Sequence, residues 1–122
     1  MNDKTSPLFA AYMRFLQLAK ALEGKSAPAE GMDANESALL EHLVLRWHEG
    51  SPMTVREAMA LDHLGSPATM HKRITRLRDM GMIDTEGKAN DRRTKFLVPS
   101  PAALEFFGAL GSKMTQVLNT AI

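Results

Sequence analysis

The stretch TVREAMALDHLGSPATMHKRITRLRDMGMIDTEGKANDRRTKFLVP, residues 54–99, decides the fold of this chain. At its start, Thr54 and Glu57 have the spacing of a capping box, in which each side chain bonds to the backbone of the other residue. This spacing predicts a short helix over about 55–61. The following segment, 62–65, ends in a glycine and predicts a tight turn.

A second helix is expected directly after this turn. Ser66 is a favoured capping residue, and Pro67 suits the first helical position, where a missing N–H costs nothing. The helix is predicted to run to about Met80 and to stop at Gly81. Its apolar residues recur at helical spacing, and three of them are expected to face inward: Met70, Ile74 and Leu77.

The hydrophobic period then changes to that of β-structure. Residues 82–86 and 94–98 are strand candidates, and their connection, 87–93, contains the Gly, Asn and Asp that hairpin turns favour. Pro99 is expected to end the second strand. A short helix, a turn, a basic helix and a hairpin in this order predict a mainly α protein with a small β-hairpin, namely a winged helix-turn-helix.

Helices are also predicted on both sides of this stretch. Residues 7–23 and 101–120 carry broad apolar stripes, and 24–32 has the composition of a connection. A helix over about 34–49 is expected to begin at a capping box of Asp33 and Glu36. The residues of this helix that are expected to face inward are Leu39, Leu40, Leu43, Val44 and Trp47.

The composition is that of one ordinary globular domain, with 122 residues, 44% hydrophobic and 24% charged. We expect a single domain over 1–122, with a lobe over 33–99 and outer helices over 7–23 and 101–120. The chain has no cysteine, which excludes disulfides, thiolate metal sites and thiol switches. No apolar run is long enough to span a membrane and no signal peptide is recognisable, so a cytoplasmic protein is expected.

The net charge of +1 hides an uneven distribution. Residues 66–95 hold eight basic and four acidic side chains, a local net charge of +4. A positive segment in a nearly neutral protein is typical of a surface that binds a polyanion, although a solvated charged face has the same composition. Together with the predicted fold, the charge favours double-stranded DNA as the partner.

The basic helix is the expected reader of the major groove, because the N-terminal residues of such a helix meet the base edges. Thr69, His71 and Lys72 are the candidates for base contacts, and Arg73 and Arg76 are expected to point outward to phosphates. The candidate DNA-binding residues of this helix are Ser66, Pro67, Ala68, Thr69, His71, Lys72, Arg73 and Arg76.

The hairpin tip carries a second group of cations, which suits insertion into the narrow minor groove. Asp91 is expected to bond within the turn and to orient an arginine. The candidate DNA-binding residues of the hairpin are Lys88, Asn90, Asp91, Arg92, Arg93 and Lys95.

Three local matches make the sequence resemble the MarR family of bacterial winged-helix transcription regulators. The tip Asp91-Arg92-Arg93 resembles the D-x-R motif of that family's wing, and a strand and a Ser-Pro-Ala helix start follow it at 100–102. The run from Leu77 to Ile83 resembles the family's L-x-x-x-G-x-I exit from the recognition helix, and Ser66 lies at the family's spacing from Gly81.

The resemblance implies a homodimer on a pseudo-palindromic operator, held together by the outer helices, with Arg93 in the minor groove. It also leaves room for a small-molecule effector. One long C-terminal helix stands where the family usually has two, and the short outer region speaks against the family's usual effector pocket. Pro99 occupies a position where the family more often has leucine.

Other classes of site find little support in the sequence. The four histidines have no metal-ligand spacing, and no phosphate loop, GxSxG or catalytic cysteine occurs, so neither an enzyme nor a cofactor is expected. The leading interpretation is a sequence-specific, dimeric repressor, and two alternatives to it stay open. One is a winged-helix module for protein–protein contact, and the other is a non-specific DNA-binding protein.

Overall fold

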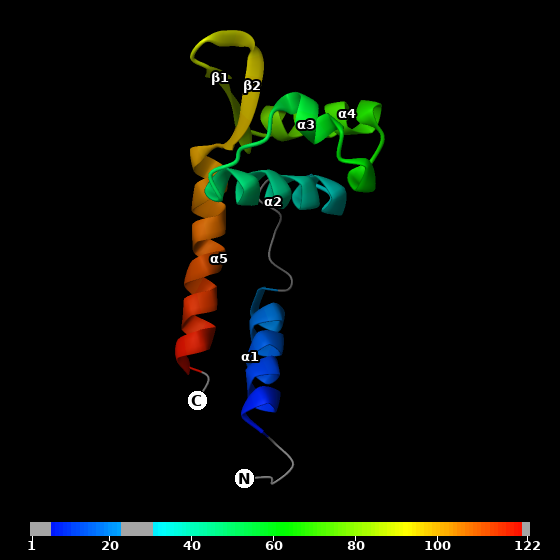
Figure 1. The fold of residues 1–122 in the computed structure, drawn as a ribbon. Helices are drawn as coiled ribbons and strands as arrows, with labels where there is room; N and C mark the ends of the chain where they lie inside the picture. Colours follow the sequence, from blue (N-terminus) through cyan, green and yellow to red (C-terminus); the bar gives the residue numbers. More distant parts are fainter. Residues whose placement is uncertain (1–5, 23–30, 121–122) are drawn as a thin grey trace. The chain divides into compact units, whose positions relative to one another are not determined.

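The structure is a computed structural model that describes residues 6–22 and 31–120, apart from the side chains of Arg92 and Thr120. Most of the connection predicted over 24–32 therefore lies outside the described residues. The described helices and strands, shown in Figure 1, are α1 (Pro7–Leu22), α2 (Ala34–His48), α3 (Val55–Met59), the 3₁₀ helix η1 (Asp62–Leu64), α4 (Pro67–Asp79), β1 (Ile83–Lys88), β2 (Asp91–Pro99) and α5 (Pro101–Thr120).

The chain divides into two compact units. One unit is 26–105, which holds α2 to β2 and the start of α5. The other combines 1–25 with 106–122 and therefore holds α1 and most of α5. The mainly helical fold with one two-stranded antiparallel hairpin confirms the predicted fold class.

Local capping sets the helix starts in the unit 26–105. At the start of α2, Asp33 Oδ1 accepts from the Glu36 N–H at 2.7 Å, and Glu36 Oε1 accepts from the Asp33 N–H at 3.0 Å. At the start of α3, Thr54 and Glu57 bond in the same reciprocal way, at 3.1 and 2.9 Å. Both predicted capping boxes are thus confirmed, and each satisfies two backbone donors that the first helical turn leaves unpaired.

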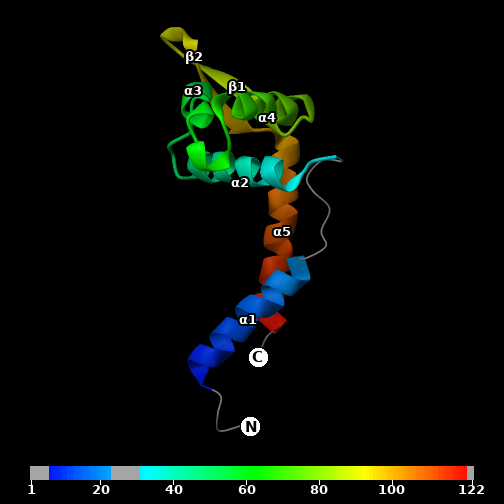
Figure 2. The ribbon, with the colours of Figure 1, turned by 90° about the vertical axis from the view of Figure 1, so that its right-hand side faces the viewer.

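The core of this unit is apolar and draws on both its helices and its hairpin. In both ribbon views, α3 and α4 lie between α2 and the outer end of the hairpin (Figures 1 and 2). The most deeply buried large apolar side chains are Leu39, Leu40, Leu43, Met70, Ile74, Leu77, Ile83 and Leu97. The inward side predicted for α4 is therefore confirmed, and its opposite side is left to solvent.

The hairpin is longer than the sequence indicated. The strands were expected over 82–86 and 94–98, but they extend to Lys88 and Asp91, and only Ala89 and Asn90 form the turn. The expectation was wrong because Lys88 still pairs with Asp91 beyond a shift of register after Gly87, and an apolar pattern cannot detect pairing between polar residues. The hairpin is joined to the segment before α3 by an antiparallel bridge between Thr54 and Phe96 and by the Leu97 N–H, which donates to Met53 O at 2.8 Å.

Two further expectations need correction. Trp47 was expected inside the core but is 36% exposed, because the buried residues of α2 end at Leu43. The third helix was expected over about 55–61 but ends at Met59, since the backbone N–H of Ala60 already turns back to the carbonyls of residues 57 and 58.

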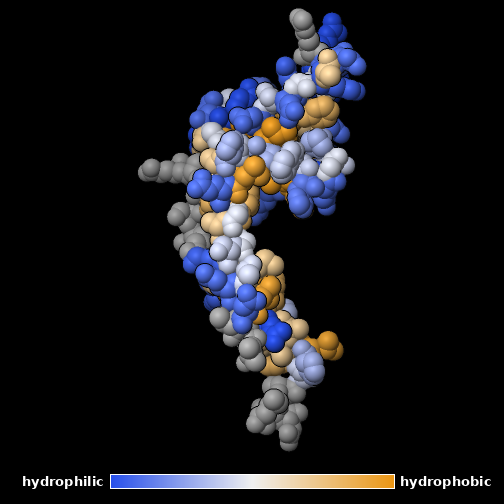
Figure 3. Space-filling model, turned by 90° about the vertical axis from the view of Figure 1, so that its left-hand side faces the viewer, coloured by the Kyte–Doolittle hydropathy of each residue, from blue (hydrophilic) through white to orange (hydrophobic). Residues whose placement is uncertain are grey.

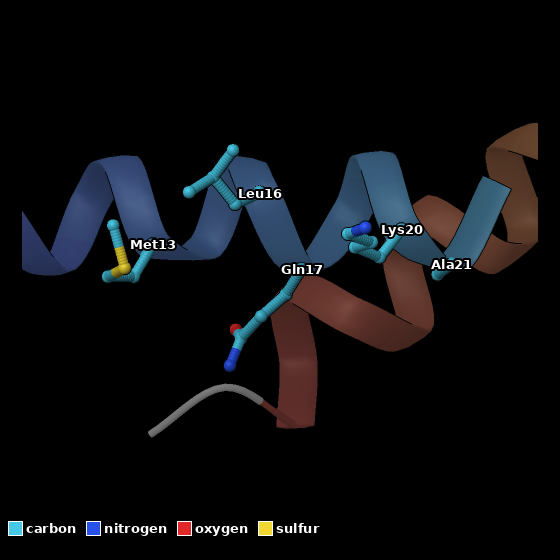
Figure 4. Close-up of a pocket in the computed structure, with 5 residues that line it drawn as sticks. All are labelled: Met13, Leu16, Gln17, Lys20 and Ala21. Atoms are coloured by element: carbon cyan, nitrogen blue, oxygen red, sulfur yellow. The ribbon is translucent and has the colours of Figure 1, made fainter. Parts of the chain in front are cut away.

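The second unit exposes apolar side chains on both of its helices, and Figure 3 shows such orange patches on its surface. The exposed large apolar residues of α1 are Leu8, Phe9, Tyr12, Phe15 and Leu16, and those of this part of α5 are Met114 and Leu118. An open groove of about 670 Å³ runs along α1, with Met13, Leu16 and Gln17 among its lining residues (Figure 4). Within the described residues, no helix combines the length and hydrophobicity that crossing a membrane requires.

Candidate nucleic-acid interface

The start of α4 is capped by a local side chain and is exposed to solvent. The Ser66 hydroxyl accepts from the Thr69 N–H at 3.2 Å and donates to the Thr69 hydroxyl at 2.9 Å. Ser66, Pro67 and Ala68 lie in the first turn, where Pro67 and Ala68 are exposed, while Thr69 is half-buried. Pro67 has no backbone N–H and the Thr69 N–H is bonded to Ser66, but the exposed start of α4 lets an anion approach the Ala68 N–H and the positive end of the helix dipole.

The outward side of α4 is a row of residues at helical spacing. Ala68, Lys72 and Thr75 lie one above the other on the side opposite the core, and all three are exposed. His71 is exposed beside this row, and its carbonyl accepts from the Thr75 hydroxyl at 3.0 Å. Ala68, His71 and Lys72 were predicted from the sequence as DNA-binding residues. Thr75 was not, although it has the helical spacing of this row.

Arg73 does not point outward as expected. Its side chain is half-buried, and Nη1 donates to the carbonyl of Leu64, the last residue of η1. The backbone at Gly65 has a positive φ of 151°, and a Cβ there would lie 2.9 Å from Arg73 Nη1. Arg73 therefore closes over the turn between η1 and α4, because that turn leaves a carbonyl that needs a donor.

Arg76 also has a partner that the sequence did not suggest. Its Nε donates to Glu36 Oε2, and its Nη2 donates to Gly31 O at 3.4 Å. The hydrogen bond to Glu36 and the charge of that carboxylate raise the pKa of Arg76 above its ordinary value. Arg76 was expected to point outward to a phosphate. Its guanidinium instead turns towards α2, because the buried carboxylate of Glu36 needs a cation.

The hairpin presents its polar side chains to solvent. Lys88, Asn90, Asp91, Arg93 and Lys95 are all exposed, and the side chain of Arg92 lies outside the described part of the structure. In both ribbon views the hairpin tip extends beyond α3 and α4 (Figures 1 and 2), and its surface in Figure 3 is mainly hydrophilic.

Asp91 bonds within the hairpin, as the sequence predicted. Its Oδ1 accepts from the Arg93 N–H at 2.9 Å, and its Oδ2 accepts from the Thr94 hydroxyl at 2.6 Å. These two bonds, that of Thr94 first, hold the pKa of Asp91 below its ordinary value. The carboxylate orders the backbone that carries Arg93, and its described bonds do not reach an arginine side chain.

Arg56 also lies beside the hairpin, although it was not among the DNA-binding residues predicted from the sequence. A groove of about 580 Å³ lies between α3 and β2, and Arg56, Arg93 and Lys95 are among its lining residues. A cation on the solvent side of the short helix was the available signal, but the sequence does not show that this helix lies against the hairpin. Within residues 6–22 and 31–120, no group of three or more His, Asp or Glu side chains is placed to hold a metal ion.

The fold of this chain is similar to that of solved MarR-type regulators. The chain is similar to a MarR-like transcriptional regulator from Thermotoga maritima, with 17% identity, a TM-score of 0.63, and 95% of this chain and 80% of that chain covered. The chain has the fold of the MarR family. MepR from S. aureus, solved with ethidium bromide, is similar over 98% of this chain and 82% of its own, with a TM-score of 0.61 and 15% identity.

A further MarR-family regulator, AbsC from Streptomyces coelicolor, has 22% identity and a TM-score of 0.52, and 94% of this chain and 72% of that chain are covered. No protein-family model and no curated protein matches the sequence. In the MarR-like fold, α3, η1 and α4 form the helix-turn-helix and the hairpin forms the wing. The family resemblance given by the motifs at 77–83 and 91–93 therefore agrees with the fold.

Proposed function

We propose that this protein is a sequence-specific transcriptional regulator that binds double-stranded DNA as a homodimer and acts as a repressor. One observation carries the proposal: a solvent-facing helix start and a cation-bearing hairpin belong to the same compact unit. In this proposal α4 enters the major groove, with Lys72 and Thr75 on its outward row, and Arg93 of the wing enters the minor groove. Such a protein works in the cytoplasm and has no catalytic centre.

The corrected positions of two arginines make the proposal more specific. Arg73 is engaged with Leu64 O and Arg76 with Glu36, so the positive charge of the outward row of α4 comes chiefly from Lys72. The exposed helix start adds the backbone N–H of Ala68 and the positive end of the helix dipole for a phosphate. Base contacts thus fall to a small group around Lys72, His71 and Thr75, and phosphate contacts fall mainly to the wing and the helix start.

Fluorescence anisotropy on DNA from upstream of the protein's own gene tests the proposal. The affinity should fall steeply with salt, because each neutralised phosphate releases condensed cations. Lys72→Ala and Arg93→Ala should each weaken binding roughly 5- to 100-fold. Arg14→Ala is the matched control, because it removes an exposed arginine from α1 and leaves the unit 26–105 intact.

The outcome of this experiment also separates the alternatives. Equal affinity for operator and unrelated DNA would make the protein a non-specific DNA-binding protein. Absence of DNA binding, together with a partner that survives nuclease treatment in a pull-down, would favour the protein–protein module.

The apolar surface of the outer helices supports the homodimer. Side chains such as Leu8, which is 84% exposed, and Phe15 leave more apolar area in water than a monomer usually tolerates. Size-exclusion chromatography with light scattering should give the mass of two chains. Phe15→Glu should give one chain, whereas Ala10→Glu, which places the same charge on another side of α1, should leave the dimer intact.

A further inference from the structure

The groove between α3 and β2 has a backbone frame that keeps its two walls together. Its lining residues are Thr54, Val55, Arg56, Asp91, Arg93, Thr94 and Lys95. The bridge between Thr54 and Phe96 and the bond from the Leu97 N–H to Met53 O join the two walls beside the groove. The groove of about 580 Å³ is therefore part of the folded unit 26–105.

The groove has an excess of positive charge. Arg56, Arg93 and Lys95 contribute cations, and all three side chains are exposed. Arg93 and Lys95 both line the groove from β2, at the irregularity where the strand register shifts between Gly87 and Lys88. Among the described residues no acidic side chain forms an ion pair with any of these cations.

The nearby carboxylates are already engaged in local bonds. Both oxygens of Asp91 accept hydrogen bonds within the hairpin, from the Arg93 N–H and the Thr94 hydroxyl. Glu57, next to Arg56 in the chain, accepts from the Thr54 N–H at 2.9 Å as part of its capping box. The two threonine hydroxyls are engaged as well, so the groove offers cations to a ligand and few other groups.

We infer that this groove binds a phosphodiester group of the DNA backbone, with Arg56 as the principal contact and Lys95 beside it. The inference rests on the proposed DNA-binding function and adds a site on α3 to it. A phosphate is favoured because a guanidinium can donate two parallel hydrogen bonds to its oxygens. The groove also adjoins the hairpin residues proposed to contact DNA, so a phosphate bound there belongs to the same duplex.

A phosphate contact at Arg56 would affect the affinity for DNA but not the preference for one DNA sequence over another. A phosphate held between α3 and the wing fixes the register of the protein on the duplex without reading the sequence. Removal of the Arg56 guanidinium should therefore weaken binding to operator and unrelated DNA by the same factor, roughly 3- to 30-fold. Removal of a base-reading side chain from α4 would instead reduce the ratio between the two affinities.

Arg56→Gln in the full chain tests the inference by the salt dependence of DNA affinity. The slope of the logarithm of the binding constant against the logarithm of the salt concentration should fall by about 0.9 for one phosphate released per chain, and by twice that for a dimer. Arg56→Lys should restore the slope but only part of the affinity. Arg14→Gln is the matched control, and thermal unfolding of each variant checks that α3 still folds.

Replacing one operator phosphate at a time by an uncharged methylphosphonate locates the site on the DNA. At one position per half-site, the methylphosphonate should lower the DNA affinity of the wild-type protein but leave the affinity of Arg56→Gln unchanged. If the wild-type protein binds DNA but Arg56→Gln has an unchanged slope and no such phosphate exists, the inference is wrong and the proposed function stands. If the wild-type protein does not bind DNA, the proposed function itself fails.

A last experiment tests whether the groove binds free inorganic phosphate, because this anion has the same chemistry as a phosphate of the DNA backbone. Trp47 fluorescence and chemical shifts of Arg56 should show no saturable binding of inorganic phosphate at millimolar concentration without DNA. Saturable binding that Arg56→Gln abolishes would overturn the assignment to DNA and identify a site for free phosphate.

Discussion

Glu36 of α2 and Arg76 of α4 lie 40 positions apart in the chain and form a hydrogen-bonded ion pair. The carboxylate side chain is only 1% exposed, whereas that of Arg76 is 48% exposed. Oε1 of the same carboxylate accepts from the Asp33 N–H and closes the capping box of α2. One buried side chain therefore both starts α2 and ties that helix to α4.

Glu36→Gln should destabilise the protein by about 1–3 kcal/mol, as expected for a disrupted buried hydrogen bond. The amide oxygen can still accept from Asp33, but the amide N–H₂ then faces the Arg76 donor. The free energy of unfolding from urea denaturation measures the effect. Glu41→Gln is the control, because Glu41 is exposed on the same helix and should change stability by less than about 0.5 kcal/mol.

Arg73 and Lys72 are neighbours in sequence that should respond differently to truncation. Arg73→Ala removes the bond to Leu64 O and should lower the free energy of unfolding by about 1–2 kcal/mol. Lys72→Ala should leave stability within about 0.5 kcal/mol, because its side chain is exposed, but it should weaken DNA binding. Urea denaturation measures the stability of each variant, and fluorescence anisotropy measures its DNA affinity. If both variants are fully folded and weaken DNA binding equally, Arg73 does not have the inward position that the structure gives it.

Gly65→Ala should be strongly destabilising, by about 1–3 kcal/mol or more. Its φ of 151° is one that L-residues rarely adopt, and the new Cβ would lie 2.9 Å from Arg73 Nη1 and 3.2 Å from Thr69 Cγ2. The melting temperature gives the readout. Gly108→Ala serves as the comparison, because this glycine lies within α5 with no atom within 4 Å of the added methyl, and helix propensity favours the change by about 0.5–1 kcal/mol.

Stability should decrease in acid in a way that depends on two carboxylates. The backbone and side-chain hydrogen bonds from Thr54 lower the pKa of Glu57, and those from Thr94 and Arg93 lower the pKa of Asp91. A lowered folded-state pKa contributes stability above the ordinary carboxyl pKa values of 4.5 and 3.8, and this contribution is lost as the pH falls through the lower folded values.

Urea denaturation of the wild type and of Glu57→Gln at several pH values between about 2 and 7 measures this dependence. The variant should be less stable than the wild type at neutral pH, and the difference should shrink as the pH falls below the ordinary carboxyl range. A difference that stays constant over that range would show that the charge of Glu57 does not contribute.

The sequence by itself determined the local features of this protein. The capping boxes at Asp33 and Thr54, the cap at Ser66 and the buried side of α4 depend on residues within about four positions of each other, so their spacing is visible in the chain. The order of these elements was enough to predict a winged helix-turn-helix and to select α4 and the hairpin as the candidate interface.

Only the tertiary structure decided which partners the cations find. Glu36 meets Arg76, Arg73 meets Leu64 O, and Arg56 comes to the groove beside β2, each through the packing of separate elements. The length of the hairpin depends on which backbone groups pair across the two strands. The exposure of Trp47 depends on which other elements pack against the end of α2. The physical reason is that apolar periodicity states which side of an element is buried, but a charged side chain is placed by whichever unpaired group the fold brings within its reach.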